Sequence, residues 1–224
     1  MKFNDKKVII FDLDGTLINS APDLALAVNH MLISVGHTDF DEPTIDGWVG
    51  NGASILVQRA LTGSRTIDES LDSDFVANAL DIFLKFYALH LCVKTCLYPN
   101  VISTLQSLKS KGYRLAIVTN KPFNFVKPIL KGLELLELFE YFIGGDSLAE
   151  KKPSPLPLLH ICEKLNVSVA ECVMVGDSKN DILAGNACGM QTIGVTYGYN
   201  YGENIEVHNP SVVLDDFGKI RELL

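Results

Sequence analysis

The chain has 224 residues, of which 47% are hydrophobic and 21% are charged, a composition typical of a globular protein with a sizeable core. Its formal net charge is −8, and no stripe of Lys or Arg offsets it, which argues against nucleic-acid binding and against docking on anionic lipid. No apolar run approaches the roughly 18 residues of a membrane span, and the N-terminus lacks the apolar stretch of a signal peptide. We expect a cytoplasmic protein, monomeric or homodimeric, that binds neither nucleic acid nor membranes.

The first predicted strand covers Val8–Phe11 and is followed at once by Asp12 and Asp14. From residue 19 to residue 96 there is no further apolar β-like run, and helical patterns recur at 24–32, 53–61 and 75–90. The stretch from Ser20 to Asp23 is typical of a capping box with proline in the first helical turn. We therefore predict an all-helical insert over residues 19–96.

After this insert, short apolar strands alternate with helical segments. The predicted strands are Arg114–Val118, Tyr141–Ile143, Cys172–Val175, Thr192–Val195 and Val212–Leu214. Apolar spacing predicts helices over 101–108 and 181–188, each followed by a glycine that ends it. This alternation indicates βαβ units, so we expect an α/β fold in which residues 1–18 and 97–224 form a Rossmann-like parallel sheet core covered by helices.

The chain contains five cysteines, an odd number, and no C-x-x-C pair. They are Cys92, Cys96, Cys162, Cys172 and Cys188. Cys92 and Cys96 are one helical turn apart, but no His or Cys pair completes a metal site with them. We expect reduced thiols that pack as small hydrophobic side chains.

Acidic residues follow two of the predicted strands. Asp12 and Asp14 follow the first, and Asp177 and Asp181 follow the strand that ends at Val175. A D-x-D-G segment is compatible with a solvated turn or with the start of a calcium loop, but the twelfth residue of such a loop would be Asp23 rather than the required Glu. Ligands at the carboxyl ends of parallel strands share one crevice, and clustered carboxylates without His or Cys favour Mg²⁺ over zinc.

The formal charge of such a site indicates how the acids divide their roles. Four ionised carboxylates carry four negative charges, and one Mg²⁺ with Lys152 returns three, so the site would still repel an anionic substrate. One acid is therefore expected to be neutral, and a neutral acid can also donate a proton to a leaving oxygen. The most economical choice is Asp14, which leaves Asp12 to attack phosphorus as a nucleophile.

The remaining members of the predicted site bind the metal and the phosphoryl group. We expect Mg²⁺ to contact the Asp12 carboxylate, the Asp14 main-chain carbonyl, Asp177 and the substrate phosphate. Thr119 and Lys152 are expected to stabilise the charge on the phosphoryl oxygens, together with main-chain N–H groups.

Four segments in this order resemble the haloacid dehalogenase superfamily of phosphotransferases: DLDGT at 12–16, VTN at 118–120, KPSP at 152–155 and GDSKND at 176–181. The resemblance implies phosphate-binding roles for Thr119, Asn120 and Lys152, and a supporting role for Asp181. It implies that the second aspartate, Asp14, directs the chemistry to phosphomonoester hydrolysis or phosphomutation. It also implies that the helical insert is a mobile cap that excludes water and selects the substrate.

Three longer stretches, FDLDGTLINSAPDLA, GWVGNGASILVQRAL and VTYGYNYGENI, are similar to bacterial phosphatases of this superfamily that hydrolyse 2-phosphoglycolate. Gly50, Asn51 and Gly52 form either a tight turn or a helix N-terminus whose N–H groups meet the substrate carboxylate. Arg59 is either an anion contact or a surface residue. The YGYNY segment is expected to pack as a loop rather than to form a binding platform.

Several functions are compatible with these residues. The leading expectation is Mg²⁺-dependent hydrolysis of 2-phosphoglycolate to glycolate and phosphate. The alternatives in the same superfamily are a broader small-molecule phosphatase, a pyrophosphatase or a sugar phosphomutase. A phosphate sensor on an inactive enzyme scaffold belongs to a different class, and intact catalytic positions argue against it.

Overall fold

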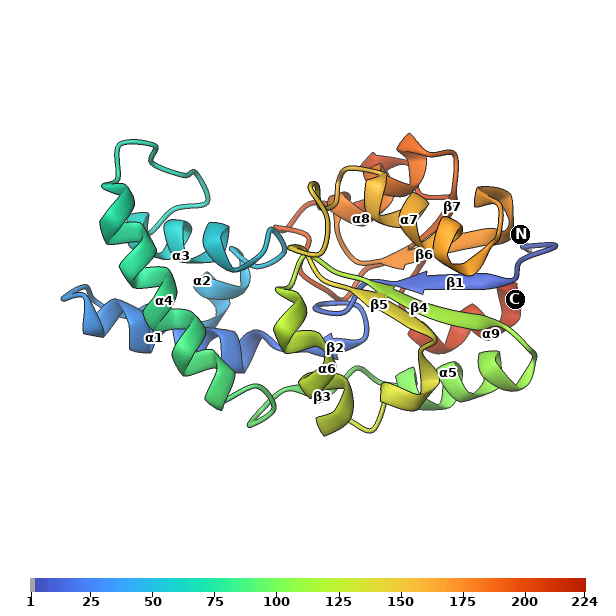
Figure 1. The fold of residues 1–224 in the computed structure, drawn as a ribbon, viewed down its shortest axis with the longest axis horizontal. Coiled ribbons are helices and arrows are strands. Elements are labelled where there is room, and N and C mark those ends of the chain that lie inside the picture. The colour runs from blue at the N-terminus through green and yellow to red at the C-terminus, as the bar shows by residue number, and fades with distance from the viewer. Residues whose placement is uncertain (1–2) are drawn as a thin grey trace.

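The structure is a computed structural model and describes residues 3–224. Six parallel strands form one sheet in the order β5-β4-β1-β6-β7-β8 (Figure 1). They are β1 (Val8–Phe11), β4 (Arg114–Val118), β5 (Tyr141–Ile143), β6 (Cys172–Gly176), β7 (Gln191–Val195) and β8 (Val212–Leu214). The six strands expected from apolar runs are thus confirmed, with bounds that differ by at most one residue at either end.

Helices cover both faces of this sheet (Figure 1). On one face lie α5 (Val101–Ser110), α6 (Phe123–Gly132) and α9 (Ile220–Leu223), and on the other lie α7 (Leu156–Leu165) and α8 (Lys179–Ala187). Successive strand residues alternate between the two layers, so Ile9 and Phe11 belong to the first core and Val8 and Ile10 to the second. Burial on both faces explains why the strands are continuous apolar runs, and it confirms the Rossmann-like α/β fold class. Short 3₁₀ helices occur at Leu136–Leu138, Val169–Glu171, Ile205–His208 and Phe217–Lys219.

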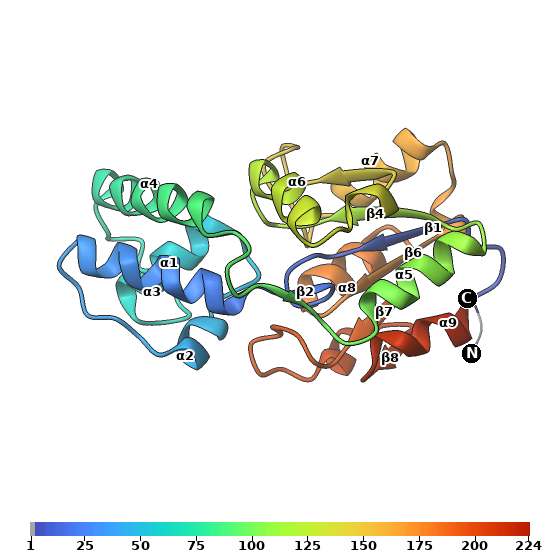
Figure 2. The same cartoon turned by 90° about the horizontal axis from the view of Figure 1, so that it is seen from below.

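Four helices form a separate group beside the carboxyl end of the sheet, which we call the helical unit (Figures 1 and 2). They are α1 (Ala21–Ser34), α2 (Glu42–Asp46), α3 (Ala53–Thr62) and α4 (Ser73–Leu89). Leu24, Val28 and Leu32 form the buried face of α1, which packs against α4. The sequence patterns located α1, α3 and α4, whereas the five-residue α2 is too short to show a helical period.

A two-stranded antiparallel ribbon joins the helical unit to the sheet. Its strands are β2 (Ile18–Asn19) and β3 (Cys96–Leu97). The boundaries expected at 18/19 and 96/97 fall inside this ribbon. Strands of two residues carry no alternation of their own, so the sequence did not predict them.

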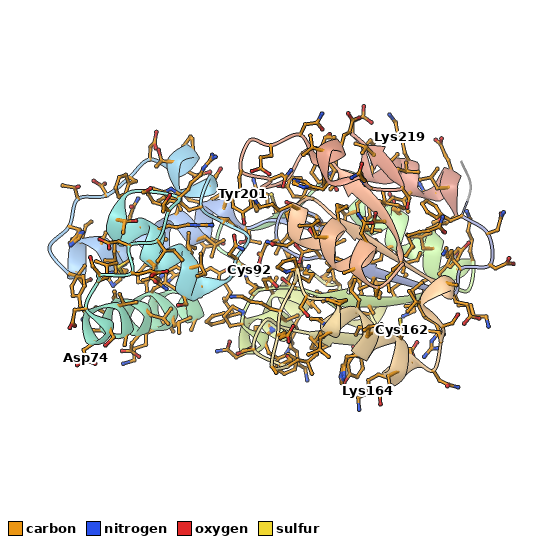
Figure 3. The ribbon with its side chains drawn as sticks, turned by 90° about the horizontal axis from the view of Figure 1, so that it is seen from above. Asp74, Cys92, Cys162, Lys164, Tyr201 and Lys219 are labelled. Atoms are coloured by element: carbon orange, nitrogen blue, oxygen red, sulfur yellow. The ribbon has the colours of Figure 1, made fainter. Side chains whose placement is uncertain are left out.

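The five cysteines carry free thiols. Cys162 and Cys172 are buried with their sulfur atoms 3.6 Å apart, as expected of thiols that pack as small hydrophobic side chains, but Cys92 and Cys96 are exposed and the packing prediction is wrong for these two. Cys92 lies near the junction of the helical unit with the sheet, and Cys162 lies within the α/β part (Figure 3). Among residues 3–224, no helix has both the length and the apolar character to cross a membrane.

Candidate active site

The polar residues singled out in the sequence follow adjacent strands. Asp12 follows β1, Thr119 follows β4 and Asp177 follows β6, and β1 pairs with both of the other strands in parallel. Parallel strands deliver their carboxyl ends to the same edge of a sheet, so these side chains converge on one crevice.

Lys152 is buried between two carboxylates. Its ammonium lies 2.9 Å from Asp12 Oδ1 and 2.6 Å from Asp181 Oδ1, and its side chain is only 1% exposed. Burial lowers the pKa of Lys152, but Asp12 and Asp181 raise that pKa more, so the lysine stays charged. The other oxygen of Asp181 accepts hydrogen bonds from the main-chain N–H and the hydroxyl of Ser178. Asp181 is therefore fully engaged in holding Lys152 and the start of α8.

Three buried carboxylates gather around this lysine. Oxygen atoms of Asp12, Asp177 and Asp181 all lie within 4.8 Å of one another. Burial raises the pKa of Asp12 to about 7 against the opposing effect of Lys152, and burial together with Asp181 raises the pKa of Asp177 well above its ordinary value. Burial disfavours the ionised form of both acids and their neighbours' negative charge adds to this, so an added cation would stabilise the ionised acids. Hard oxygen donors at this spacing fit Mg²⁺.

Asp177 is held in place by its neighbours. Its Oδ1 accepts a 2.7 Å hydrogen bond from the Thr16 hydroxyl, and its Oδ2 accepts a 2.6 Å hydrogen bond from the main-chain N–H of Tyr199. Gly15 has φ +88°, and a Cβ on it would lie 2.3 Å from Asp177 Oδ2. Only glycine permits this approach, which explains why the DLDGT segment has glycine at position 15. The YGYNY segment packs as a loop over Asp177, as the sequence analysis expected.

Asp14 contacts two side chains that the sequence analysis did not connect with it. Its carboxylate accepts a 2.6 Å hydrogen bond from Ser20 Oγ, and its two oxygens lie 2.8 and 3.0 Å from Lys121 Nζ. Asp23, the other end of the expected capping box, accepts hydrogen bonds from the main chain of residues 93–95. The capping-box prediction is therefore wrong, because both side chains make tertiary contacts instead.

Lys121 changes the charge of the site. It directly follows the VTN segment, and this position was its only sequence signal. Burial lowers the pKa of Lys121, but Asp14 and Tyr87 raise it more, so the pKa lies above its usual range. Counting this cation brings the formal charge of the site, with Mg²⁺, from one negative charge to zero. Charge balance alone thus no longer requires a neutral Asp14 before the substrate binds.

The helical unit contacts the α/β part through main-chain oxygens. The carbonyl of Gly50 accepts hydrogen bonds of 3.1 Å from Asn120 Nδ2 and 3.2 Å from Asn180 Nδ2. The carbonyl of Asn51 accepts a 2.8 Å hydrogen bond from Lys151 Nζ. The Asn120 amide nitrogen also donates to the carbonyl of Lys152, so this side chain holds two protein segments, and its role in phosphate binding stays a prediction.

The residues predicted for substrate contact in the helical unit have different positions. Gly50 and Gly52 line the pocket, and Gly52 precedes α3 with φ +87°. Asn51 turns away, since its side-chain oxygen accepts a hydrogen bond from the Tyr201 hydroxyl at the junction of the two parts (Figure 3). Arg59 donates to the carbonyls of Trp48 and Arg65 and is not among the residues that line the pocket, so its role as an anion contact stays a prediction.

A pocket lies between the helical unit and the carboxyl end of the sheet. The sheet side contributes Asp12, Asp14, Thr119, Asn120 and Lys121, and the helical unit contributes Leu24, Val49, Leu56, Phe83 and Tyr87 among others. Polar and charged groups thus form one wall and mostly apolar groups the opposite wall. This arrangement suits a small anionic substrate that lies between the two parts.

A parallel α/β sheet with a helical insert, a carboxylate pair after its first strand and a buried lysine defines a hydrolase of the haloacid dehalogenase type. The family model described as haloacid dehalogenase-like hydrolase matches residues 6–189, and the chain belongs to this family. It is 53% identical over 220 residues to phosphoglycolate phosphatase of Colwellia psychrerythraea, an alignment that covers 98% of this chain and 97% of that protein.

Other relatives agree. Phosphoglycolate phosphatase of Psychrobacter arcticus is 48% identical over 98% of this chain and 96% of that protein. Among solved structures, a predicted phosphoglycolate phosphatase from Haemophilus somnus 129pt superposes with a TM-score of 0.91 at 41% identity and covers 98% of both chains.

Proposed function

We propose that this protein hydrolyses 2-phosphoglycolate to glycolate and phosphate with Mg²⁺ as its cofactor. The observation that carries the proposal is the position of Asp12, which lines the pocket beside Asp14 and contacts Lys152 within the cluster of buried acids. Similarity to phosphoglycolate phosphatases over nearly the whole chain supports the choice of substrate.

The reaction proceeds in two displacements. An oxygen of Asp12 attacks phosphorus, the bond from phosphorus to the ester oxygen breaks, and Asp14 gives its proton to the departing glycolate oxygen. Asp14 then takes a proton from a water molecule, whose oxygen attacks the phosphorus of the aspartyl-phosphate. This second step releases phosphate and restores the Asp12 carboxylate. Lys152 and the hydroxyl of Thr119 stabilise the charge on the phosphoryl oxygens.

The carboxylates of Asp12 and Asp177, with the main-chain carbonyl of Asp14, are the groups that would hold Mg²⁺. When bound, the ion neutralises acidic charge so that a phosphate dianion can approach. Asp181 acts at a distance by fixing Lys152.

Phosphate release from a panel of compounds tests the proposal. The panel contains 2-phosphoglycolate, pyrophosphate and sugar phosphates, each measured with Mg²⁺ and with EDTA. We expect 2-phosphoglycolate to give the highest kcat/KM and EDTA to abolish turnover. A different leading substrate would refute the substrate assignment, and consumption of a sugar phosphate without phosphate release would favour a phosphomutase.

A further inference from the structure

Lys121 is a cation of the pocket to which the proposed chemistry assigns no step. Its side chain is 3% exposed, and it is the sole Lys or Arg among the described residues that line the pocket. An ammonium group carries three N–H donors. Two of those of Lys121 are sufficient for the contacts with the two oxygens of Asp14, at 2.8 and 3.0 Å. One donor is left over, so Lys121 can hold Asp14 and bind another acceptor at the same time.

Tyr87 approaches the same point from the helical unit. The Lys121 ammonium lies 4.9 Å from the centre of the Tyr87 ring, which belongs to α4. The tyrosine is 1% exposed, and its hydroxyl, which lies beside the Lys121 ammonium, makes no hydrogen bond of good geometry within residues 3–224. Burial raises the pKa of Tyr87 to about 12, so the hydroxyl keeps its proton at neutral pH. A buried hydroxyl without a partner is unfavourable, and an anionic ligand in the pocket would satisfy it.

The surroundings make this point selective for negative charge. Leu24, Leu56, Phe83 and Phe125 line the same pocket, and apolar walls strengthen the attraction between a buried cation and an anion. Among the described residues that line the pocket, the helical unit contributes no Lys or Arg, and the guanidinium of Arg59 is engaged with main-chain carbonyls elsewhere.

The geometry of the substrate fits the spacing of these groups. An ester oxygen that takes a proton from Asp14 lies beside the Asp14 carboxylate, whose two oxygens are 2.8 and 3.0 Å from Lys121 Nζ. In 2-phosphoglycolate one methylene separates the ester oxygen from the carboxylate carbon, so the carboxylate oxygens lie about 3 Å from the ester oxygen. A carboxylate at this distance is within reach of the free donor of Lys121.

Building on the proposed function, we propose that Lys121 and the hydroxyl of Tyr87 bind the substrate carboxylate and so determine specificity. The site then selects phosphomonoesters that carry a second anionic group one carbon away from the ester oxygen. Because Lys121 belongs to the sheet side and Tyr87 to the helical unit, the carboxylate connects the two parts when it binds.

The test compares two substrates in each enzyme preparation. The first is 2-phosphoglycolate, and the second is 2-hydroxyethyl phosphate, in which a hydroxymethyl group replaces the carboxylate. The measured quantity is the ratio of their kcat/KM values, which does not depend on the fraction of folded enzyme. Lys121→Met should lower this ratio about 10- to 150-fold, the contribution of a hydrogen bond to a charged group. Tyr87→Phe, which keeps the ring beside Lys121 and the contact between Lys121 and Asp14, should lower it about 2- to 10-fold.

Two further variants complete the experiment. Lys121→Arg keeps the positive charge and should retain most of the preference. Lys127→Met makes the same charge change at an exposed position of α6 that does not line the pocket, and it should leave the ratio unchanged. If Lys121 serves only to hold Asp14, Lys121→Met will slow the hydrolysis of both substrates equally. An unchanged ratio in both Lys121→Met and Tyr87→Phe therefore overturns the inference, while the proposed function stands. A wild-type enzyme without preference for 2-phosphoglycolate would overturn both.

Discussion

Replacing Lys152 with methionine should destabilise the protein by an amount that the structure makes predictable. The lysine side chain is 1% exposed and lies 2.9 Å from Asp12 and 2.6 Å from Asp181. Removing one partner from a buried ion pair costs about 3–5 kcal/mol, because the charge left behind has neither water nor a counter-ion. For a chain of this length, 1 kcal/mol shifts Tm by about 2–4 °C, so we expect Tm to fall by about 6–20 °C without metal.

The loss should grow with pH. In the folded protein, burial raises the pKa of Asp12 to about 7 from the ordinary value of 3.8, and Lys152 opposes that rise. Without the lysine, the folded-state pKa moves higher still while the unfolded-state pKa does not change. A carboxyl group with a raised folded-state pKa stabilises the fold while it is protonated, and this stability is lost as the pH rises through that pKa. The variant should therefore be closer to wild type at pH 5.5 than at pH 8.

Thermal and urea unfolding in EDTA at these two pH values would measure the effect. Lys164→Met is the control, because this lysine is exposed on α7, far from the acidic cluster (Figure 3). Its substitution should change stability by no more than about 0.5 kcal/mol. A loss below about 1 kcal/mol for Lys152→Met, or an equal loss at both pH values, would refute the electrostatic account of the cluster.

Three other substitutions probe separate parts of the site. Asp12→Asn should reduce phosphate release by about 10⁴-fold or more, and substantial residual turnover would contradict its role as nucleophile. Gly15→Ala places a methyl group on the neighbouring metal-site carboxylate and should raise the Mg²⁺ concentration for half-maximal activity about 10- to 100-fold. Gly36→Ala, with φ +80° but open space around it, should leave that concentration unchanged, and equal effects would implicate backbone strain instead. Asp23→Asn should destabilise the fold by about 1.5–3 kcal/mol and expose residues 91–96 to proteolysis, whereas Asp74→Asn, at an exposed position, should leave cleavage as in wild type.

The sequence was most informative where the position of a residue in the sheet restricts which residue types can occur there. Strands buried on both faces must be apolar throughout, so runs such as Val8–Phe11 were visible without any tertiary information. Acids directly after such runs lie at the same edge of a parallel sheet, so the sequence alone predicted that Asp12 and Asp177 are close to each other.

Contacts between distant segments were not predictable in this way. Lys121 and Asp14 are 107 residues apart, and nothing in the sequence near either residue indicates their pairing. Ser20 has the local pattern of a helix cap, but its hydroxyl donates a hydrogen bond to the Asp14 carboxylate instead. Arg59 looked available for a substrate anion, and only the folded chain shows that main-chain carbonyls already occupy it.

The carbonyl of Gly50, which accepts hydrogen bonds from Asn120 and Asn180, has a consequence for how this protein can diverge. The acceptor belongs to the main chain, so no replacement of a side chain in the helical unit removes it directly. Residues that line the pocket from that unit, such as Leu56 and Phe83, can change the shape of the pocket while the attachment to the catalytic loops persists. The shape of the pocket and the attachment of the helical unit can therefore evolve on separate residues, because the two asparagines provide the attachment.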